Sequence, residues 1–352
     1  MSLPIALPLE PMLCRTAAAI PPGMAYEPKW DGFRCLVFRD NDEVSLISRN
    51  GRDLSVYFPE VVAALLANTP PRCVLDGELV VIVGPRLDFV KLTERIHPAA
   101  TRIELLSTTM PASFVAWDLL ALDDTALLDE PFAERRAALE RALANADAPI
   151  HLTPLTTDLP TAQRWFAEFE GAGLDGVIAK PLDGPYLPGQ RAMTKIKHKR
   201  EADVVVAGYR LHKNSTPERR LLGSLQLGLY DDAGVLHFVG VSAAFPEATR
   251  ASLAELLGGM ELAVGGEHPW AAAAEVAGRR PGSISRWSTE LKETHLIDPM
   301  LVCTVGYEHM EGTRFRHTTR FQRWRDDRDP ASCTFDQLEE VVSFDLDEIL
   351  SR

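Results

Sequence analysis

A lysine with charged residues on both sides is the first feature of this chain that is suited to chemistry. Residues 26–34 read YEPKWDGFR, in which Lys29 lies two residues after Glu27, two before Asp31 and five before Arg34. A lysine amine becomes a nucleophile when burial or neighbouring cations lower its pKa. Because most lysines are solvated surface residues, this stretch alone leaves both roles open.

Two further clusters have the spacing of side chains that share one face of a β-strand. Asp76 and Glu78 flank a glycine in VLDGELVVIV, and Lys195 and Lys197 alternate in TKIKH. Because alternate residues of a strand point to the same side, each pair is expected to enter one pocket. Two carboxylates and several lysines, with Lys29, are the composition of a nucleotide and metal site. The expected metal is Mg²⁺, held by carboxylate and phosphate oxygens.

Short strands and amphipathic helices are expected to position these clusters. Alternating apolar residues predict strands within 25–56 and at 74–83, 114–122, 176–180 and 193–199. Helical spacing predicts helices at 59–68, 131–144 and 160–171. After about residue 200, several short strands with one helix around 246–258 are typical of a small Greek-key barrel of the OB type.

The length of the chain favours two domains. At 352 residues the chain exceeds what a single core usually supports. The change of pattern places the boundary near Lys199–Ala202, which gives an N-terminal domain at 1–199 and a second domain at 200–330. The remaining residues, 331–352, are predicted to form an acidic C-terminal tail.

Composition argues against a membrane or secreted protein. No apolar run reaches the roughly 18 residues of a membrane span. Pro4, Pro8 and Pro11 interrupt an N-terminal stretch that lacks the basic start of a secretory signal. The five cysteines include no CxxC pair, so neither a zinc site nor a disulfide framework is expected. We therefore expect a cytoplasmic protein with no membrane partner.

The net charge of −13 conceals two basic segments. Residues 191–200, RAMTKIKHKR, contain five Lys or Arg and no acid, and residues 314–328, RFRHTTRFQRWRDDR, contain six arginines against two aspartates. Much of the acidity lies from Asp329 onward. A basic groove for a polyanion is therefore compatible with an acidic protein, although a solvated face has the same pattern.

These clusters and several others follow one another in the order typical of one enzyme superfamily. The stretch Lys29-Trp30-Asp31-Gly32-Phe33-Arg34 resembles the KxDGxR signature of the covalent nucleotidyltransferases, which include DNA ligases, RNA ligases and mRNA capping enzymes. The stretches that resemble the later motifs, in family order, are Ser48-Arg49-Asn50-Gly51, Asp76-Gly77-Glu78, Trp117-Asp118, Asp175-Gly176-Val177-Ile178-Ala179-Lys180, Lys195-Ile196-Lys197 and Arg325-Asp326-Asp327-Arg328. Within the superfamily, the chain is most similar to the bacterial ATP-dependent DNA ligases of the small LigC type.

The resemblance implies both a fold and a reaction. The implied fold is α+β, with a nucleotidyltransferase domain of ATP-grasp-like antiparallel sheets and flanking helices, followed by an OB-fold β-barrel. In the implied reaction Lys29 attacks the α-phosphate of ATP, AMP then moves to the 5′-phosphate at a DNA nick, and the 3′-hydroxyl displaces it. The implied cofactors are ATP and Mg²⁺ or Mn²⁺. The implied partner is nicked duplex DNA, bound by a monomer.

The resemblance also implies roles for individual residues, with Lys29 as the catalytic nucleophile. The implied nucleotide-binding residues are Glu27, Arg34, Arg49, Glu78, Trp117, Lys180, Lys195, Lys197, Arg325 and Arg328. The implied metal ligands are Glu78 and Asp175. The implied DNA-binding residues are Arg49, Arg314, Arg316, Arg320 and Arg323.

More specific roles follow from the same resemblance. Glu27 and Trp117 would flank the adenine, whereas Arg34 and Glu78 would address the ribose. Lys180, Lys195 and Lys197 would line the α-phosphate. Arg325 and Arg328 would orient the pyrophosphate during the first step only, with a hinge in Lys199–Ala202. Asp31 and Asp76, each before a glycine, are expected to support turns.

Two residues depart from the family pattern. The fourth motif begins with Asp175 where a glutamate is usual, so the expected metal-binding carboxylate is one methylene shorter. The last motif ends in Arg328 rather than lysine, which keeps the charge but changes the geometry of a phosphate contact.

Other functions share parts of this pattern. An RNA ligase or a capping-type guanylyltransferase would use the same scaffold, and spacing does not distinguish adenine from guanine. NAD as the donor is disfavoured, because the cysteines provide no counterpart to the zinc finger of NAD-dependent ligases. A non-catalytic OB-type binder of single strands would have an incomplete set of lysines and carboxylates. Since the set is complete, a DNA ligase with a role in DNA repair is the favoured interpretation.

Overall fold

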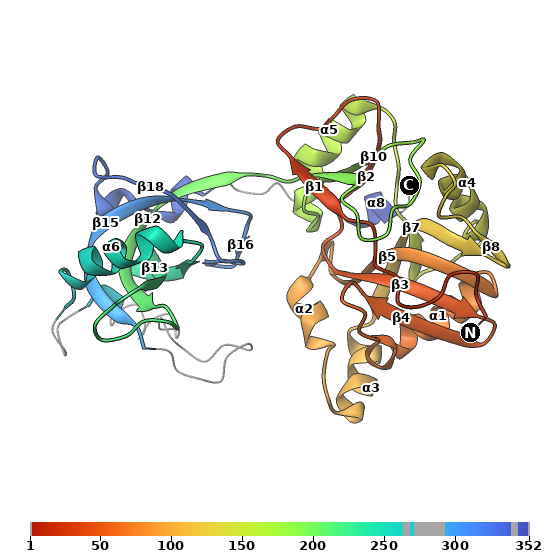
Figure 1. The fold of residues 1–352 in the computed structure, drawn as a ribbon, viewed down its shortest axis with the longest axis horizontal. Coiled ribbons are helices and arrows are strands. Elements are labelled where there is room, and N and C mark those ends of the chain that lie inside the picture. The colour runs from red at the N-terminus through yellow and green to blue at the C-terminus, as the bar shows by residue number, and fades with distance from the viewer. Residues whose placement is uncertain (1, 263–267, 271–292, 339–343, 351–352) are drawn as a thin grey trace. The chain divides into compact units, whose positions relative to one another are not determined.

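The chain folds into two compact units. The computed structural model describes residues 2–262, 268–270, 293–338 and 344–350. The first unit comprises Met1–Lys197 and Val341–Arg352, and the second comprises His198–Glu340 (Figure 1). No helix of the described residues is long and apolar enough to span a membrane.

The larger sheet of the first unit holds the N-terminal motifs. Its strand order is β4-β3-β5-β7-β8, with β6 added beside β5 and β9 beside β7. These strands are β3 (Phe33–Asp40), β4 (Glu43–Ser48), β5 (Arg72–Val83), β6 (Arg86–Leu87), β7 (Ala112–Leu122), β8 (Thr125–Ala126) and β9 (Ile150–Leu152). Pairing is antiparallel except between β7 and β9. The sheet therefore matches the predicted class of antiparallel sheets with flanking helices.

The smaller sheet of the first unit carries the remaining lysines. Its order is β1-β11-β10-β2, with β1 parallel to β11 and the other pairs antiparallel. Its strands are β1 (Cys14–Ala17), β2 (Ala25–Pro28), β10 (Val177–Lys180) and β11 (Met193–Ile196). Because β2 and β10 lie far apart in sequence, this sheet brings the first and fourth motifs side by side.

Apolar residues on both faces of the larger sheet explain why the first unit is layered. Along β3, Cys35 and Val37 join the core beneath helix α1 (Pro59–Asn68), whereas Leu36 and Phe38 join a core shared with Met193 and Tyr186. Alternate side chains of one strand thus serve two layers. The other helices of this unit are α2 (Phe89–Glu94), α3 (Ala100–Thr109), α4 (Phe132–Ala142) and α5 (Leu159–Glu168), with 3₁₀ turns at Ser55–Tyr57 and Phe169–Ala172.

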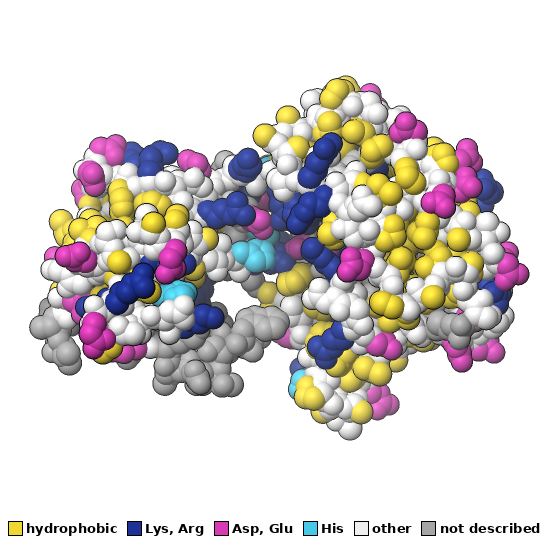
Figure 2. Space-filling view, in the orientation of Figure 1, with side chains coloured by type: hydrophobic (Ala, Val, Ile, Leu, Met, Phe, Trp, Pro, Cys, Tyr) yellow, Lys and Arg dark blue, Asp and Glu magenta, His cyan; other side chains and the backbone are white. Residues whose placement is uncertain are grey.

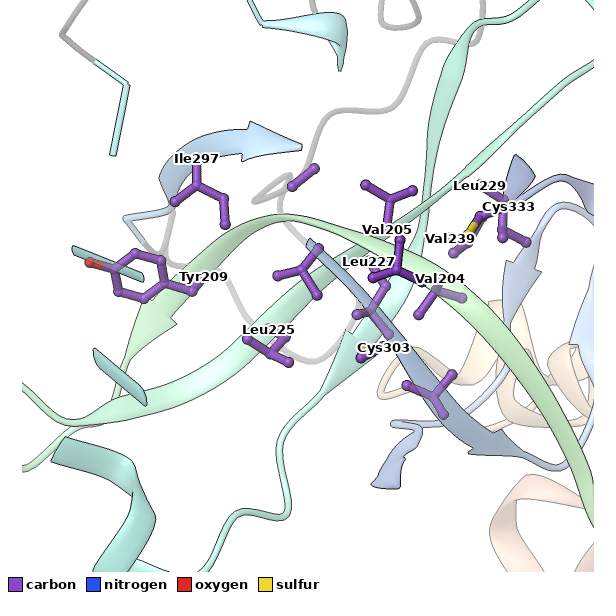
Figure 3. Packing of buried hydrophobic residues seen from close by; sticks show 14 of the residues in the cluster. Val204, Val205, Tyr209, Leu225, Leu227, Leu229, Val239, Ile297, Cys303 and Cys333 are labelled. Atoms are coloured by element: carbon purple, nitrogen blue, oxygen red, sulfur yellow. The ribbon is translucent and has the colours of Figure 1, made fainter. Parts of the chain in front are cut away.

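The second unit is built on a curved antiparallel sheet. Its strand order is β14-β13-β12-β15-β18, and a short β16-β17 ribbon and helix α6 accompany it. These elements are β12 (Arg200–Leu211), β13 (Leu222–Tyr230), β14 (Leu236–Ser242), α6 (Glu247–Gly258), β15 (His295–Tyr307), β16 (Met310–Glu311), β17 (Arg314–Phe315) and β18 (Arg320–Trp324). Figure 3 shows its apolar core, in which Val204, Leu227 and Cys303 come from three neighbouring strands. This arrangement agrees with the predicted OB fold.

The strand that opens the second unit begins within the predicted hinge at Lys199–Ala202, and motion at this hinge stays a prediction. β12 pairs with β15 from its first residue, Arg200 opposite Tyr307. Residues 200–202 therefore belong to a hydrogen-bonded ladder, and the chain passes from one unit to the other at Lys197–His198.

The C-terminal residues do not form the separate acidic tail that the charge pattern predicts. Residues up to Glu340 belong to the second unit, with 3₁₀ turns at Pro330–Ser332 and Phe335–Gln337. The described residues 344–350, which include the short helix α8 (Asp347–Leu350), return to the first unit. The physical reason is that apolar residues alternate with the acids. Leu346 and Ile349 are fully buried, and the ring of Phe344 lies 5.0 Å from that of Phe169.

Candidate active site

Lys29 lies against a carboxylate that it shares with a second lysine. Its Nζ is 2.9 Å from Asp175 Oδ2, and Lys197 Nζ is 2.6 Å from the same oxygen. Although burial acts in the opposite direction, the two lysines lower the pKa of Asp175 to about 2. Burial disfavours the charged form of Lys29, but the charge of Asp175 outweighs it and raises the pKa of the lysine. Asp175 therefore acts on the pKa of Lys29 in the direction opposite to neighbouring cations, and a lowering of this pKa by cations that include a bound metal stays a prediction.

Backbone hydrogen bonds hold the first motif against the fourth. Lys29 donates from its backbone N to Gly176 O, and Asp175 donates from its backbone N to Lys29 O, both at 2.9 Å. Gly176 has a φ of +107°, and a Cβ there would lie 2.0 Å from Ile196 O. A side chain at this position would thus separate the start of β10, which Asp175 precedes, from the end of β11, which Lys197 follows.

Glu78 closes the site from the larger sheet. It lies on β5, is buried, and accepts a hydrogen bond of 3.0 Å from Gly32 N. Burial raises the pKa of Glu78 to about 8, partly offset by the charges of Lys29 and Arg34. A Cβ at residue 32 would collide with Leu79 O, so the glycine permits this close approach. Glu78 and Lys29 are therefore brought together, as the motifs predict.

Arg34 is occupied by a partner that the sequence does not reveal. Its guanidinium donates to both carboxylate oxygens of Asp76, at 3.0 and 2.6 Å, and to Met12 O. Tyr186 donates from its hydroxyl to Asp76 Oδ2 at 2.8 Å. Asp76 is thus a fully buried partner in the middle of β5, and its predicted role in a turn is wrong. Contact of Arg34 with a ribose stays a prediction.

Glu27 and Lys180 form a buried pair at one end of the site. Lys180 Nζ is 2.6 Å from Glu27 Oε2, and it also lies 5.9 Å from the ring centre of Trp117 and 4.6 Å from that of Phe132. Burial raises the pKa of Glu27, while the charges of Lys180 and Arg136 offset part of the rise. Lys180 therefore lies with the residues expected at the base, rather than with those expected at the α-phosphate.

A β-bulge aims Trp117 at this end of the site. Asp76 pairs with Asp118 and Gly77 pairs with Ala116, so Trp117 is the extra residue between them. A bulge of this kind re-aims a side chain without ending the strand. The indole lies 5.5 Å from the guanidinium carbon of Arg34.

A row of side chains crosses the smaller sheet on the face toward the larger one. Ile178 pairs with Glu27 on one side and with Lys195 on the other, and Thr16 lies beyond Lys195. Directly opposed residues share a face, and Ile178 packs in the core between the sheets. The row thus links the Glu27 end of the site to the lysines near Asp175. Figure 2 shows Lys and Arg side chains gathered on the side of the first unit where β1 and β2 lie.

Arg325 and Arg328 converge on one carboxylate within the second unit. Asp203 Oδ2 lies 2.6 Å from Arg325 Nη1 and 3.4 Å from Arg328 Nη1. Arg325 also donates to both oxygens of Asp327, at 2.8 and 2.9 Å. The two arginines of the last motif are therefore a fixed pair.

The chain matches two family models, which together span most of its length. Residues 11–197 match the ATP dependent DNA ligase domain, and residues 218–328 match the ATP dependent DNA ligase C terminal region. DNA ligase C2 of Mycolicibacterium smegmatis is 55% identical over 345 residues, which cover 96% of each chain. DNA ligase C of Mycobacterium tuberculosis is 51% identical over 358 residues, which cover 99% of each chain. The chain belongs to the ATP-dependent DNA ligase family.

Solved structures support the fold of this ATP-dependent DNA ligase. A Lig E DNA ligase, described as binding DNA with a minimal scaffold, superposes with a TM-score of 0.55 at 15% identity. The match covers 90% of this chain and 99% of that one. At this identity the likeness shows the fold alone. The family models and the curated relatives support the DNA ligase interpretation over the RNA ligase, capping-enzyme and non-catalytic alternatives.

The remaining predicted DNA-binding residues of the ligase lie at varied positions. Arg49 is exposed in the turn after β4, and Arg320 and Arg323 are exposed on β18. Arg314 stacks its guanidinium over the ring of Phe238 at 4.6 Å, and Arg316 lies 2.8 Å from His309 Nε2. DNA contact by all five arginines stays a prediction.

Several residues of the ligase site are absent from the sequence-based set. Asp118 forms a fully buried bidentate pair with Arg135, at 2.8 and 3.0 Å. Arg136 Nη1 lies 3.6 Å from Glu27 Oε1, and neither atom has a hydrogen-bond partner among the described residues. The sequence signal is the spacing of the two arginines, which lie three and four residues after Phe132, on the same helix stripe as Leu139.

The carboxylates of the site fit the expected Mg²⁺. Among the described residues, no three His, Cys, Asp or Glu side chains gather in a group able to hold a metal ion. Mg²⁺ is commonly bound through one or two carboxylates together with water and substrate phosphates, so a smaller set suffices. Glu78 and Asp175, which both interact with Lys29, provide such a set.

Proposed function

We propose that the chain seals nicks in duplex DNA with ATP through a covalent lysyl-AMP intermediate on Lys29. The observation that carries the proposal is the position of Lys29, 2.9 Å from Asp175 in a site that also holds Glu78 and Lys197. Family membership supports the same reaction class.

In the first step, Lys29 Nζ attacks the α-phosphorus of ATP. A P–N bond forms, the bond between the α-phosphorus and the bridging oxygen breaks, and pyrophosphate leaves. Lys29 must first lose a proton, and its pairing with Asp175, which raises the pKa of the lysine, opposes this loss. In the complex with ATP, Lys195 and Lys197 offset the negative charge of the phosphates. Contact of Lys197 with a phosphate would replace part of its contact with Asp175, the carboxylate that it shares with Lys29.

The base end of the site is assigned to adenine. Trp117 provides a face for stacking, and Glu27 provides an acceptor whose Oε1 lacks a hydrogen-bond partner among the described residues. Lys180 orients Glu27 through their 2.6 Å ion pair. An acceptor at this position suits the amino group of adenine rather than the carbonyl oxygen of guanine.

Glu78 and Asp175 would hold Mg²⁺, and a bound Mg²⁺ would neutralise phosphate charge and orient the α-phosphate. Mn²⁺ has a similar preference for oxygen ligands and is proposed as a substitute. In the second and third steps, a 5′-phosphate oxygen of the nick takes AMP from Lys29, and the 3′-hydroxyl then attacks the 5′-phosphorus and releases AMP.

Arginines on both units are assigned to phosphates. Arg49 of the first unit, together with Arg314, Arg316, Arg320 and Arg323 of the second, is proposed to contact the DNA backbone. Arg325 and Arg328 are proposed to contact the pyrophosphate part of ATP in the first step. The proposal also includes a monomeric enzyme that acts in the cytoplasm. Sedimentation of the purified chain with and without nicked DNA would test the monomeric state.

The test is transfer of label from the α-phosphate of a nucleotide to the protein. The wild-type chain, incubated with Mg²⁺ and labelled ATP or GTP, is expected to become labelled only by ATP and to seal a nicked duplex. Lys29→Ala is expected to do neither while keeping its circular dichroism spectrum and melting temperature. Labelling by GTP alone, or sealing by Lys29→Ala, would overturn the proposal.

A further inference from the structure

One carboxylate of the second unit is positioned to hold two arginines at once. Asp203 lies on β12 and is buried, and its Oδ2 contacts both Arg325 Nη1 and Arg328 Nη1. The two guanidinium groups come from residues 122 and 125 positions later in the chain. No motif of the sequence includes Asp203.

Asp203 is itself held by neighbours on several sides. Its Oδ1 accepts a hydrogen bond of 2.6 Å from Thr304 Oγ1, the residue directly opposite on β15. Its backbone N donates to Gln337 Oε1 at 2.7 Å, and its backbone O accepts from Gln337 Nε2 at 2.9 Å. The amide of Gln337 also donates to Thr334 O at 2.8 Å. The sheet therefore fixes the carboxylate through Thr304, and the turn that follows the last motif fixes the backbone of Asp203.

Each arginine has further contacts that set its direction. Arg325 donates from its backbone N to Val302 O at 2.9 Å and from its side chain to Asp327. Arg328 donates to Ser332 Oγ at 3.1 Å and to Ser332 O at 3.2 Å. Together with the contact to Asp203, these hydrogen bonds use three of the five N–H groups of Arg325, and Arg328 approaches Asp203 as an ion pair at 3.4 Å. Both side chains stay partly exposed, at 21% and 32%, so an anion in solvent can reach the two guanidinium groups.

Two arginines that face the same oxygen would repel each other without the charge between them. A planar guanidinium binds phosphate through paired donors, so its orientation decides whether the contact forms. We propose that Asp203, braced by Thr304 and Gln337, is a positioning residue that fixes Arg325 and Arg328 as a pair of donors for the polyphosphate of the nucleotide. This inference rests on the proposed function, because it assigns the pair to the first step of ligation.

A purely structural ion pair would have different consequences. If Asp203 only stabilised the second unit, its loss would affect all steps of ligation to a similar extent. A positioning role affects the steps that involve pyrophosphate and spares the sealing of DNA that already carries AMP. The ratio of these activities therefore separates the two roles.

The experiment compares Asp203→Asn with the wild-type chain and with Glu201→Gln. Glu201 lies two residues earlier on β12 and is 56% exposed, so it controls for loss of a carboxylate on this strand. For Asp203→Asn we expect protein labelling from ATP, and release of ATP when pyrophosphate is added to the labelled protein, to fall by about 10- to 100-fold. Sealing of a nicked duplex with a pre-formed 5′-adenylate is expected to stay within about twofold, as are all three activities of Glu201→Gln.

Equal loss of all three activities, or unchanged labelling, would overturn the inference. Thr304→Val and Gln337→Ala keep the carboxylate and serve if Asp203→Asn does not fold. Each is expected to lower labelling by about three- to tenfold, because Thr304→Val removes a hydrogen bond to the carboxylate and Gln337→Ala removes two to the backbone of Asp203. Unchanged labelling in both would also overturn the inference. If the wild-type chain takes no label from ATP, the proposed function itself fails, which is a distinguishable result.

Discussion

In each of the two units, one carboxylate oxygen lies between two cationic side chains. The cations are lysines in the first unit and arginines in the second. In the first unit Asp175 Oδ2 lies 2.9 and 2.6 Å from two lysines. In the second unit Asp203 Oδ2 lies 2.6 and 3.4 Å from two arginines. A lysine can release its proton and act as a nucleophile, whereas an arginine keeps its charge and its planar set of donors. The comparison therefore assigns bond formation to the first unit and phosphate orientation to the second.

The largest expected effect on labelling comes from replacing the lysine nucleophile of the first unit by arginine, the type of cation found in the second unit. Lys29→Arg keeps a positive charge beside Asp175 but removes the amine that can lose its proton. Labelling from ATP should fall to background, since loss of a nucleophile typically lowers a rate by about a million-fold. Lys91→Arg, at a solvated position on α2, is the matched control and should be labelled normally. Labelled Lys29→Arg would contradict the assignment.

A third ion pair, Asp118 with Arg135, allows the effect of burial on the free energy of unfolding to be measured apart from any catalytic role. Asp118 and Arg135 are fully buried and have no proposed chemistry, so Asp118→Asn leaves an uncompensated cation in the core. The free energy of unfolding should fall by about 3–5 kcal/mol, measured by urea denaturation. Asp124→Asn removes a 92% exposed carboxylate that pairs with Arg72, and should change stability by less than about 0.5 kcal/mol. A similar loss of unfolding free energy in both variants would show that burial does not determine how much an ion pair contributes to stability.

The shared carboxylate of the first unit should tolerate a change of length better than a loss of charge. Asp175→Asn is expected to lower labelling from ATP by about 10- to 100-fold, since it removes a charge from both lysines and from the proposed metal site. Asp175→Glu restores the residue that is usual in the family and should stay within about threefold of wild type. Initial rates of labelling at saturating ATP provide the measurement. An active Asp175→Asn would remove this carboxylate from the mechanism.

The smallest effects are expected from the solvated arginines of the second unit. Replacing Arg320 and Arg323 together by Gln should weaken binding of nicked DNA by a few-fold and reduce the slope of log K against log salt by about 2. Fluorescence anisotropy across a salt series would measure both. Arg219→Gln, at a residue that is 67% exposed, is the control. An unchanged slope in the double variant would place both arginines outside the DNA interface.

Local sequence patterns predicted the elements well where a strand or helix is defined by its own residues. The helix at 59–68 has the predicted bounds, and the strands at 74–83 and 114–122 extend only slightly beyond them. The motifs also placed Lys29 beside Asp175 and Glu78. The helices at Phe89–Glu94 and Ala100–Thr109 were absent from the prediction. The first is only six residues long, and the second buries only Leu106, so neither shows an apolar stripe of helical period.

Partners of the charged residues were harder to predict than the residues themselves. Arg34 pairs with Asp76 across 42 positions, and Arg325 pairs with Asp203 across 122. Such pairs depend on strand order and register, which single-sequence periodicity does not contain. The raised pKa of Lys29 has the same origin, because it arises from a carboxylate that only the folded chain brings near.

The return of residues 344–350 to the first unit has a consequence for how the protein is made. Leu346 and Ile349 join the core that contains Trp165 and Phe169, and Leu346 N donates to Pro85 O at 2.9 Å. Domains of nascent chains generally fold in the order in which they are synthesised. Here the first unit cannot complete its core until the ribosome has synthesised the whole second unit, so residues 344–350 pack onto partners that were synthesised well before them.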